Sequence, residues 1–507
     1  FTCDVFGDRV LGMRHLLLTI FLILFALPSW GQTTFSGGNI SGGKIGNNSS
    51  SSNQQNNLVS SDLEKGVMYQ LSSEYFIKQE PKKLFSFFPH QYSNISENHH
   101  LVISVYGSED LSNDGINEIF GAIYVFDEND EYHTSIKAKP FILEWNSDTN
   151  QLQTSHRWKN IFPKMTFPRR FETFKNKQNG TTDIFIADYG VDGFSPKHPN
   201  CGAQNRWFQI NGNNITEKTE ELPNINDMTH DLVVEDLNQD GLADLVALND
   251  PIPNKQKCTG LRLEEKSYIL LSSKSGFKKF YFDEIGIEKH LYLAGEAQLN
   301  SNNGFHLILS RDGSHTKGGI DIYNFEMKNS NLKINYNETF SLNNENLGAE
   351  IRKGDIDNDG VDEFVISNSA SKDWRGNKLF IASNKKGKWI LSRLFYEENL
   401  HGNLGKKDRG WCERIFLIDI DKNSMIDYIC TNRTKANQLK RIPVIFNNKE
   451  KYQGVKLMNN KFRQFFPLMM PEQLDNLLVG TKYGRATSKD VMIEWQFFGY
   501  KIPKHTP

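Results

Sequence analysis

One short stretch places oxygen-bearing side chains at the spacing that a hard cation requires. Asp236, Asn238, Asp240 and Asp244 stand at positions 1, 3, 5 and 9 of a loop between two apolar runs, with Gly241 at position 6. Alternate side chains turn inward in such a loop, glycine allows the sharp bend, and the carbonyl at position 7 adds a ligand. An EF-hand would place its closing acid at position 12 between helices. Here the acid comes at position 9 and the flanks resemble strands, which predicts a calcium-binding β-hairpin.

The same spacing recurs, which distinguishes it from a single polar turn. The predicted ligand sets, each with its position-7 carbonyl donor, are Asp110, Ser112, Asp114, Ile116 and Glu118; Asp236, Asn238, Asp240, Leu242 and Asp244; Asp355, Asp357, Asp359, Val361 and Glu363; and Asp419, Asp421, Asn423, Met425 and Asp427. The fourth loop is weaker, because Ser424 stands where glycine takes the bend more easily. We therefore predict three calcium (Ca²⁺) sites and a marginal fourth.

Composition narrows the classes of partner. The chain has 507 residues, of which 38% are hydrophobic and 24% charged, and its formal net charge is −2. Its length allows a large core and by itself allows several domains. The near-neutral charge gives no reason to expect nucleic acid or an anionic membrane as a partner. An aromatic content of 12% favours strands over helices.

The first 62 residues are predicted to lie outside the folded part. Residues 1–12 precede the first methionine and are set aside as an upstream or mis-set start. Residues 13–31 combine a basic start, an apolar run too short to span a bilayer and small residues before a cut after Gly31, which predicts a secretory signal peptide. Residues 32–62 are rich in Gly, Ser, Asn and Gln, as in a flexible linker. We expect a secreted, periplasmic or extracellular monomer without a membrane span after signal removal.

From residue 63 onward the sequence repeats with a period near 60 residues. The residues that close each loop, each followed by an apolar run, are Glu118, Asp183, Asp244, His306, Glu363, Asp427 and Asp475. Each unit has the pattern strand, acidic loop, strand, long polar loop, strand, turn, strand, which is typical of propellers. Seven units fill residues 63–507, so the sequence predicts an all-β, seven-bladed β-propeller with calcium-binding hairpin loops. Several β-sandwich domains are the alternative, but they would not give one constant period.

The last unit has room for only three strands. These are expected around Phe462–Met470, Leu477–Lys482 and Val491–Tyr500. A segment near Val67–Ile77 would then supply the fourth strand and pair with an edge that would otherwise be exposed.

These loops resemble the FG-GAP/VCBS repeats of integrin α-subunit propellers and of many secreted bacterial proteins. The segments DIFIADYGVDG, NRWFQINGNN and THDLVVEDLNQDGLADLVALN are similar to the bacterial branch, and the resemblance covers roughly residues 100–485. It implies a calcium-loaded propeller, whereas adhesion, lectin, scaffold and occasional lyase roles in this family leave the function open. The loops before Asp183, His306 and Asp475 depart from the pattern, so no calcium is expected there.

The predicted meander separates two faces of the molecule. Calcium loops lie at one end of the strands as structural clips, while the long second loops and the inter-blade connections lie at the other. That second face is rich in aromatic and basic groups, which suit a glycan or an extracellular protein. Its candidate ligand-binding residues are Arg170, His198, His230, Arg311, His315, Trp374, Arg375 and Trp411. The alternative is that most of them are ordinary loop residues or rim packing.

The cysteines give two further expectations. Cys201 and Cys258 occupy the second loops of successive units, so we predict a disulfide between them. Cys412 and Cys430 lie in adjacent predicted strands about four positions out of register, which is too far for a direct bond.

Catalytic motifs give little support for an enzyme. The sequence has no G-x-S-x-G, H-E-x-x-H or C-x-x-C motif, and no phosphate-binding or dinucleotide-binding glycine loop. Asp231, Glu350 and Glu413 near first-strand starts could line a central channel beside His230, as an assembled acid site. We therefore expect a calcium-stabilised binding or adhesion module, with no catalytic residue assigned. A carbohydrate-active enzyme, such as a polysaccharide lyase, is the alternative.

Overall fold

The computed structural model divides into two units, residues 1–58 and residues 59–507, and every residue described below belongs to the second. The described residues are 76–78, 83–84, 99–127, 138–146, 148, 151–155, 157–158, 162–191, 201–250, 266–288, 291–300, 304–311, 319–328, 331–341, 347–368, 378–396, 410–420, 422–434, 441–447, 452–457, 464–469, 477–481, 484–486 and 491–500. The predicted signal peptide and linker lie outside them. No helix within these segments is long and apolar enough to cross a membrane.

The described chain is all-β, as predicted, with a single short 3₁₀ turn at Thr219–Glu221 among its described residues. The strands are β1 (Phe76–Lys78), β2 (Lys83–Leu84), β3 (His99–Glu109), β4 (Glu118–Asp127), β5 (Lys139–Asn146), β6 (Gln151–Thr154), β7 (Pro168–Asn176), β8 (Thr181–Asp188), β9 (Ala203–Gln204), β10 (Arg206–Asn211), β11 (Asn214–Glu217), β12 (Asn226–Asp227), β13 (Thr229–Glu235), β14 (Asp244–Asn249), β15 (Tyr268–Leu271), β16 (Lys278–Tyr281), β17 (Tyr292–Asn300), β18 (Gly304–Arg311), β19 (Gly319–Lys328), β20 (Asn331–Ser341), β21 (Leu347–Gly354), β22 (Glu363–Asn368), β23 (Lys378–Lys385), β24 (Lys388–Tyr396), β25 (Gly410–Ile418), β26 (Asp427–Thr434), β27 (Arg441–Asn447), β28 (Tyr452–Leu457), β29 (Gln464–Leu468), β30 (Leu477–Thr481), β31 (Gly484–Ala486) and β32 (Val491–Tyr500).

Most strands belong to antiparallel four-stranded sheets whose strand order follows the chain, such as β13-β14-β15-β16 and β17-β18-β19-β20. The second strand of each sheet begins at or within two residues of the predicted loop-closing position. Thus β14 begins at Asp244, β22 at Glu363 and β26 at Asp427, while β18 begins at Gly304. The repeat inferred from sequence is therefore present as a repeated sheet.

The core lies between consecutive sheets. Val246 and Ile269 of the β13–β16 sheet share one apolar cluster with Phe305, Leu309 and Phe325 of the next sheet. The rings of Phe305 and Phe325 stack with centroids 4.8 Å apart. Every residue of β8 and of β14 is buried, because both faces of these second strands are covered. Burying each large side chain stabilises the fold by roughly 1.5–3 kcal/mol.

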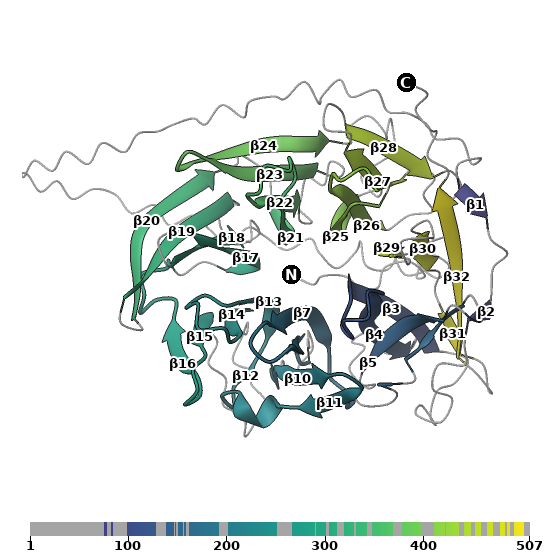
Figure 1. The fold of residues 1–507 in the computed structure, drawn as a ribbon, viewed down its shortest axis with the longest axis horizontal. Coiled ribbons are helices and arrows are strands. Elements are labelled where there is room, and N and C mark those ends of the chain that lie inside the picture. Colours follow the sequence, from purple (N-terminus) through teal and green to yellow (C-terminus); the bar gives the residue numbers. More distant parts are fainter. Residues whose placement is uncertain are drawn as a thin grey trace, which may run out of the picture. The chain divides into compact units, whose positions relative to one another are not determined.

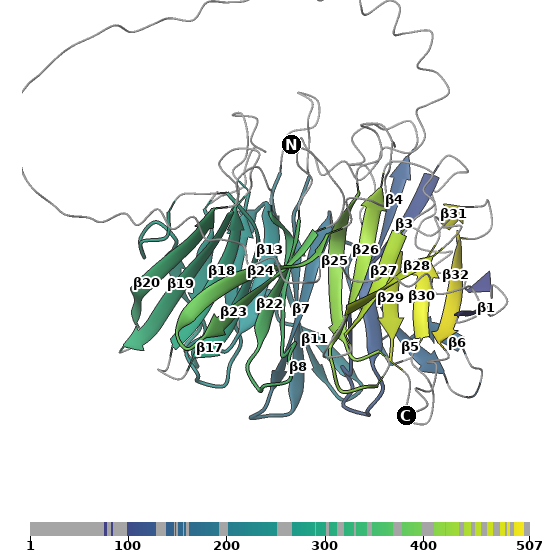
Figure 2. The same cartoon turned by 90° about the horizontal axis from the view of Figure 1, so that it is seen from above.

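The first strand of each repeat, meaning the strand that comes earliest in that repeat, contacts the first strand of the next repeat (Figure 1). These contacts join β3 to β7, β7 to β13, β13 to β17, β17 to β21, β21 to β25 and β25 to β29, and β29 also contacts β3. Figure 2, turned by 90° from Figure 1, shows that the strands of neighbouring sheets run alongside one another.

The two ends of the described chain share hydrogen bonds. In β32, Tyr500 pairs with Phe76 of β1, and Glu494 pairs with Lys83 of β2. β31 pairs with both β32 and β3, so the last and first sheets form one ten-stranded sheet. The prediction that an N-terminal segment pairs with the last unit is confirmed for Phe76 and Ile77.

The cysteine predictions are tested in part. Cys201 is disulfide-bonded, as predicted, while its predicted partner Cys258 lies outside the described residues. Cys412 pairs in register with Asn432, so it is two residues out of register with Cys430 along β26, not four. A bulge between Cys412 and Arg414 accounts for part of the difference.

Candidate metal centres and the buried charge cluster

The four predicted metal loops share one hydrogen-bond pattern at position 1. In the loop between β13 and β14, Asp236 Oδ1 accepts a bond from the Asp240 amide at 2.9 Å and Oδ2 accepts one from the Gly241 amide at 2.8 Å. The same two bonds, with N–O distances of 2.7 to 3.0 Å, recur at Asp110, Asp355 and Asp419. The position-1 carboxylate therefore fixes each loop to itself.

The acid that closes each loop makes a second shared contact. The amide at position 2 donates to Glu118 at 2.7 Å, to Glu363 at 2.9 Å and to Asp427 at 2.9 Å, and the amide at position 3 donates to Asp244 at 3.0 Å. All four closing acids are buried. Each loop thus presents an inward-facing acid at its start and its end.

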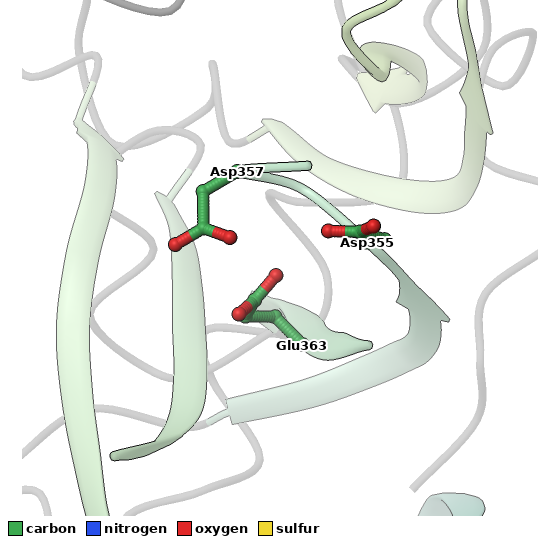
Figure 3. A group of neighbouring side chains, drawn as sticks. All are labelled: Asp355, Asp357 and Glu363. Atoms are coloured by element: carbon green, nitrogen blue, oxygen red, sulfur yellow. The ribbon is translucent and has the colours of Figure 1, made fainter. Parts of the chain in front are cut away.

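The loop between β21 and β22 has its carboxylates in closest array. Ligand oxygens of Asp355, Asp357 and Glu363 lie within 4.8 Å of one another, facing across the loop in Figure 3. Carboxylate and carbonyl oxygens are the donors that calcium prefers, whereas zinc prefers nitrogen and sulfur. The donor set of the described loops therefore fits a hard cation. Asp421, a predicted ligand of the fourth loop, lies outside the described residues.

The loop backbone needs two left-handed residues, and the sequence identified only one. Position 6 has φ of 87° at Gly115, 84° at Gly241 and 87° at Gly360, and Ser424 takes the same region with φ 67°. Position 4 is also left-handed, with φ of 59° or 60° in all four loops, although none of its residues is glycine. Asparagine tolerates this region, and its presence at position 4 of two loops was the signal available in the sequence.

Burial disfavours the ionised form of the closing acids when no cation is bound. Desolvation raises the pKa of Glu118, Asp244 and Glu363 to about 7 each, and neighbouring loop carboxylates add to the shift. Desolvation also raises the pKa of Asp236. A cation that coordinated these groups would offset the same cost.

Side-chain amides from neighbouring sheets hold the loops from outside, which sequence analysis did not anticipate. Gln178 donates to the Asp240 carbonyl at 2.8 Å, and Gln298 donates to the Asp362 carbonyl at 2.9 Å. Both donors come from units whose own loops lack the acid pattern. A Cβ on Gly241 would lie 1.9 Å from the Gln178 amide nitrogen, so a larger residue there would displace the Gln178 side chain, while the φ of 84° is what favours glycine.

At the other end of the strands, the predicted ligand-binding residues are described only in part. His198, His315, Trp374 and Arg375 lie outside the described residues, and Trp411 belongs to β25 without a described side chain. His230 is half-buried, with Nε2 in contact with the Arg169 guanidinium and its ring edge-on to Tyr189 at 6.2 Å. Arg169 in turn stacks on Tyr189 at 4.8 Å. Burial, reinforced by Arg169, lowers the pKa of His230 well below its ordinary value, so its ring is neutral.

Two predicted ligand-binding residues are not on an exposed face. Arg311 is 8% exposed, and its Nε lies 3.1 Å from Asp321 Oδ2. Arg170 is 2% exposed and contacts Asp231, while its Nη1 lies 2.6 Å from Glu350 Oε1. The expectation that these two side chains are exposed is wrong for the same reason in both cases: a long guanidinium side chain near a strand end turned inward to buried carboxylates.

Asp231 and Glu350, predicted to line a channel, also form ion pairs and hydrogen bonds within the fold. Glu350 Oε1 accepts a bond from Arg352 Nε at 2.8 Å, and Arg352 Nη1 donates to Glu172 at 2.7 Å. The second oxygens are used as well, since Asp231 Oδ2 accepts from the Gly295 amide at 3.1 Å and Glu350 Oε2 from the Ile415 amide at 2.9 Å.

These contacts form a buried charge cluster that joins five first strands, β7, β13, β17, β21 and β25. Although burial opposes ionisation, Arg170 and Arg352 hold the pKa of Glu350 below its usual value. Among the described groups, neither Asp231 nor Glu350 is free to act as a catalytic acid or base. The side chain of Glu413 is not described.

No protein-family model and no curated protein sequence matches this chain. Among the solved structures that resemble it at low similarity are the following three. A protein of unknown function from Dyadobacter fermentans DSM 18053 is 9% identical, covering 84% of this chain and 99% of that one, with a TM-score of 0.40. Rhamnogalacturonan lyase YesW is 12% identical over 79% and 92%, with a TM-score of 0.31. A Bacillus licheniformis rhamnogalacturonan lyase, PL11, is 9% identical over 84% and 90%, with a TM-score of 0.32. All three TM-scores lie below 0.5, so nothing about these proteins is transferred to this chain.

Replacing Arg170 by methionine will strongly destabilise the fold. The change removes the cation beside the buried carboxylate of Asp231 and leaves Glu350 with Arg352 as its ion-pair partner, and breaking a buried pair in this way typically costs about 3–5 kcal/mol. Urea unfolding measures the loss. The matched control is Arg206→Met, which removes a half-exposed partner of Glu217 and is expected to cost about 0–1 kcal/mol. Equal losses in the two variants would show that the buried charge cluster is not what links the sheets.

The chain without divalent cations will lose stability as pH rises. Glu118, Asp244 and Glu363 have folded-state pKa values of about 7, against roughly 4 when unfolded. Their contribution is complete below the unfolded pKa and is lost as pH rises through about 7, because the unfolded chain releases these protons first. In chelator, the free energy of unfolding should fall from about pH 4 to about pH 7, and Glu363→Gln should flatten that fall. A chelated protein that gains stability over this range would contradict the burial effect.

Proposed function

We propose that this chain is a secreted, calcium-stabilised, seven-bladed β-propeller of the FG-GAP/VCBS type that binds a glycan or an extracellular protein. The seven-bladed arrangement is supported by the succession of first-strand contacts, in which β29 meets both β25 and β3. In this arrangement β31 joins the last blade to the first, and β1 and β2 complete the last blade at β32.

The observation that carries the proposal is the repetition of one loop geometry. Four loops in four sheets share the position-1 bonds, the buried closing acid and the two left-handed residues. Turns selected only to reverse the chain have no need of acids at the same two positions, one of which is buried in every loop. Both acids of a loop would be ligands of one divalent cation, and oxygen donors at alternate positions match calcium. We assign the three glycine-containing loops as calcium sites and the Asp419 loop as a weaker one.

A binding role is supported by the contrast between the buried charge cluster and the candidate ligand-binding residues outside it. The buried charge cluster occupies the described first strands, so the scaffold is stiff where an assembled acid site was sought. His198, His315, Trp374 and Arg375 fall in the sequence between strands β8 and β9, β18 and β19, and β22 and β23, and connections on a rigid scaffold are where binding residues concentrate. The disulfide at Cys201 supports an oxidising compartment, in line with secretion.

One observation favours the second candidate, a polysaccharide lyase. A neutral imidazole at His230 lies against the cationic Arg169, beside Tyr189. A lyase needs a base to remove a proton and a cation to stabilise the neighbouring carboxylate of an acidic sugar. Arg169 and His230 have those properties. We place this activity second, because both groups also pack as structure between β7 and β13.

Removing calcium will lower the melting temperature. Extracellular sites commonly bind at ~10⁻⁴ to 10⁻³ M, so calcium at tenfold excess over the dissociation constant adds about 1.4 kcal/mol per site. Asp359→Ala should remove one bound ion in native mass spectrometry and part of the calcium-dependent shift. Glu220→Ala, an exposed acid outside the loops, is the control and should change neither. Identical melting with calcium and with chelator would reduce these loops to turns.

Incubation with a panel of neutral and acidic glycans separates the two functions. Retention of an intact glycan is expected for the binding module, whereas unsaturated products would identify a lyase. If products appear, His230→Ala should abolish them while leaving calcium stoichiometry unchanged, since His230 lies at the end of β13 opposite to the Asp236 loop. A protein that neither retains nor cleaves any glycan in the panel would leave an extracellular protein as the ligand, which pull-down on immobilised candidates then tests.

A further inference from the structure

Asn447, the last residue of β27, is built into the fourth metal loop through its backbone. Its amide donates to Asp427 Oδ1 at 2.8 Å, and its carbonyl accepts a bond from Asn423 Nδ2 at 2.9 Å. Asp427 and Asn423 are positions 9 and 5 of that loop. Asn447 is 1% exposed, so its backbone position depends directly on how the fourth loop is ordered.

The side chain of Asn447 belongs to a different loop. Its Nδ2 donates to the carbonyl of Ile356 at 3.0 Å, in the metal loop of the preceding sheet. The Ile356 amide in turn donates to the closing acid Glu363 at 2.9 Å. A continuous path therefore runs from Asp427 through Asn447 and Ile356 to Glu363. Its four members are 0%, 1%, 2% and 6% exposed, so water does not compete for these bonds.

We propose that Asn447 couples calcium binding at the two loops, so that an ion in the 419–427 loop raises the affinity of the 355–363 loop. The inference rests on the calcium sites of the proposed function. An ion at Asp427 and Asn423 fixes the Asn447 backbone, and the fixed side chain then holds the Ile356 peptide and, through it, Glu363. The second ion meets a loop that is already ordered and loses less conformational entropy on binding. By linkage, the effect is equal in both directions.

The β13–β16 sheet has an equivalent contact that stays within its own loop. The pairings Leu245–Leu270 and Tyr428–Ile445 place Ser272 and Asn447 at equivalent positions, two residues further along. Like Asn447, Ser272 donates its amide to the closing acid, Asp244, at 2.6 Å, and its carbonyl accepts from Asn238 at 3.0 Å.

The two residues differ in where the side chain points. The Ser272 hydroxyl turns back to Asp244 at 2.8 Å and stays within its own loop. Serine at this position therefore keeps the local contacts and lacks the reach to a second sheet. Asn447→Ser is accordingly a substitution that this fold already accommodates elsewhere.

A double-mutant cycle on the full chain tests the coupling. Asp419→Asn disables the fourth loop, and calorimetric titration with calcium follows the ion that Asp359→Ala removes. In the presence of Asn447, Asp419→Asn should lower the calcium affinity of the 355–363 loop on the order of fivefold. In the Asn447→Ser background, Asp419→Asn should leave it unchanged. Ser272→Ala is the control and should leave the fivefold effect intact.

Hydrogen exchange gives a second readout that a merely structural role would not move. At saturating calcium, the peptide containing Ile356 should exchange faster in Asp419→Asn than in the unaltered chain, with no comparable change around Asn238. This comparison does not depend on how well Asn447→Ser folds.

The outcomes separate the two proposals. If Asp359→Ala removes an ion but Asp419→Asn acts equally with asparagine and with serine at position 447, the coupling is refuted and the calcium sites stand. If Asp359→Ala removes no ion, the calcium sites fail and the coupling fails with them.

Discussion

A single guanidinium group lies at the centre of the contacts among five first strands. Arg170 reaches from β7 to a carboxylate on β13 and to another on β21, and each carboxylate also accepts an amide bond from a further strand. Five strands therefore meet through charges that water cannot reach. Hydrophobic contact alone would leave neighbouring sheets free to slide, because it lacks direction. The ion pairs and amide bonds define a specific register, at the cost of desolvating every member.

The loops at the ends of these strands use the same kind of device on a smaller scale. Each closing acid is buried at the start of a second strand and accepts an amide bond from its own loop. Glu118, Asp244 and Glu363 are then in an environment that favours their neutral form, which protonation relieves and a bound cation would relieve. Stability of the sheets is thus linked to the charge state of these three carboxyl groups. The amides of Gln178 and Gln298 extend this link to sheets whose own loops lack acids.

Periodicity in the sequence predicted the repeated sheets well, because a loop that closes with an acid before an apolar run leaves a local mark at every repeat. Asp244, Glu363 and Asp427 each begin a strand for that reason. Position 6 of the loops was equally local, since glycine or a strained Ser424 must supply the bend. Arg170 was misplaced because no local pattern says whether a guanidinium at a strand start turns outward to solvent or inward to acids 61 and 180 residues away. Gln178, Gln298 and Asn447 were missed for a related reason. No local sequence pattern identifies the distant carbonyl to which an amide side chain donates.

The pairing of β1 and β2 with β32 has a consequence for the order of assembly. Phe76 pairs with Tyr500, more than 400 residues later, so the sheet that contains both cannot be completed until residue 500 has left the ribosome. The middle sheets, whose strands are consecutive, face no such delay. Closing so long a loop costs chain entropy that no early contact offsets. The final sheet is therefore the last to form, and until then β32 is an open edge that another molecule can pair with.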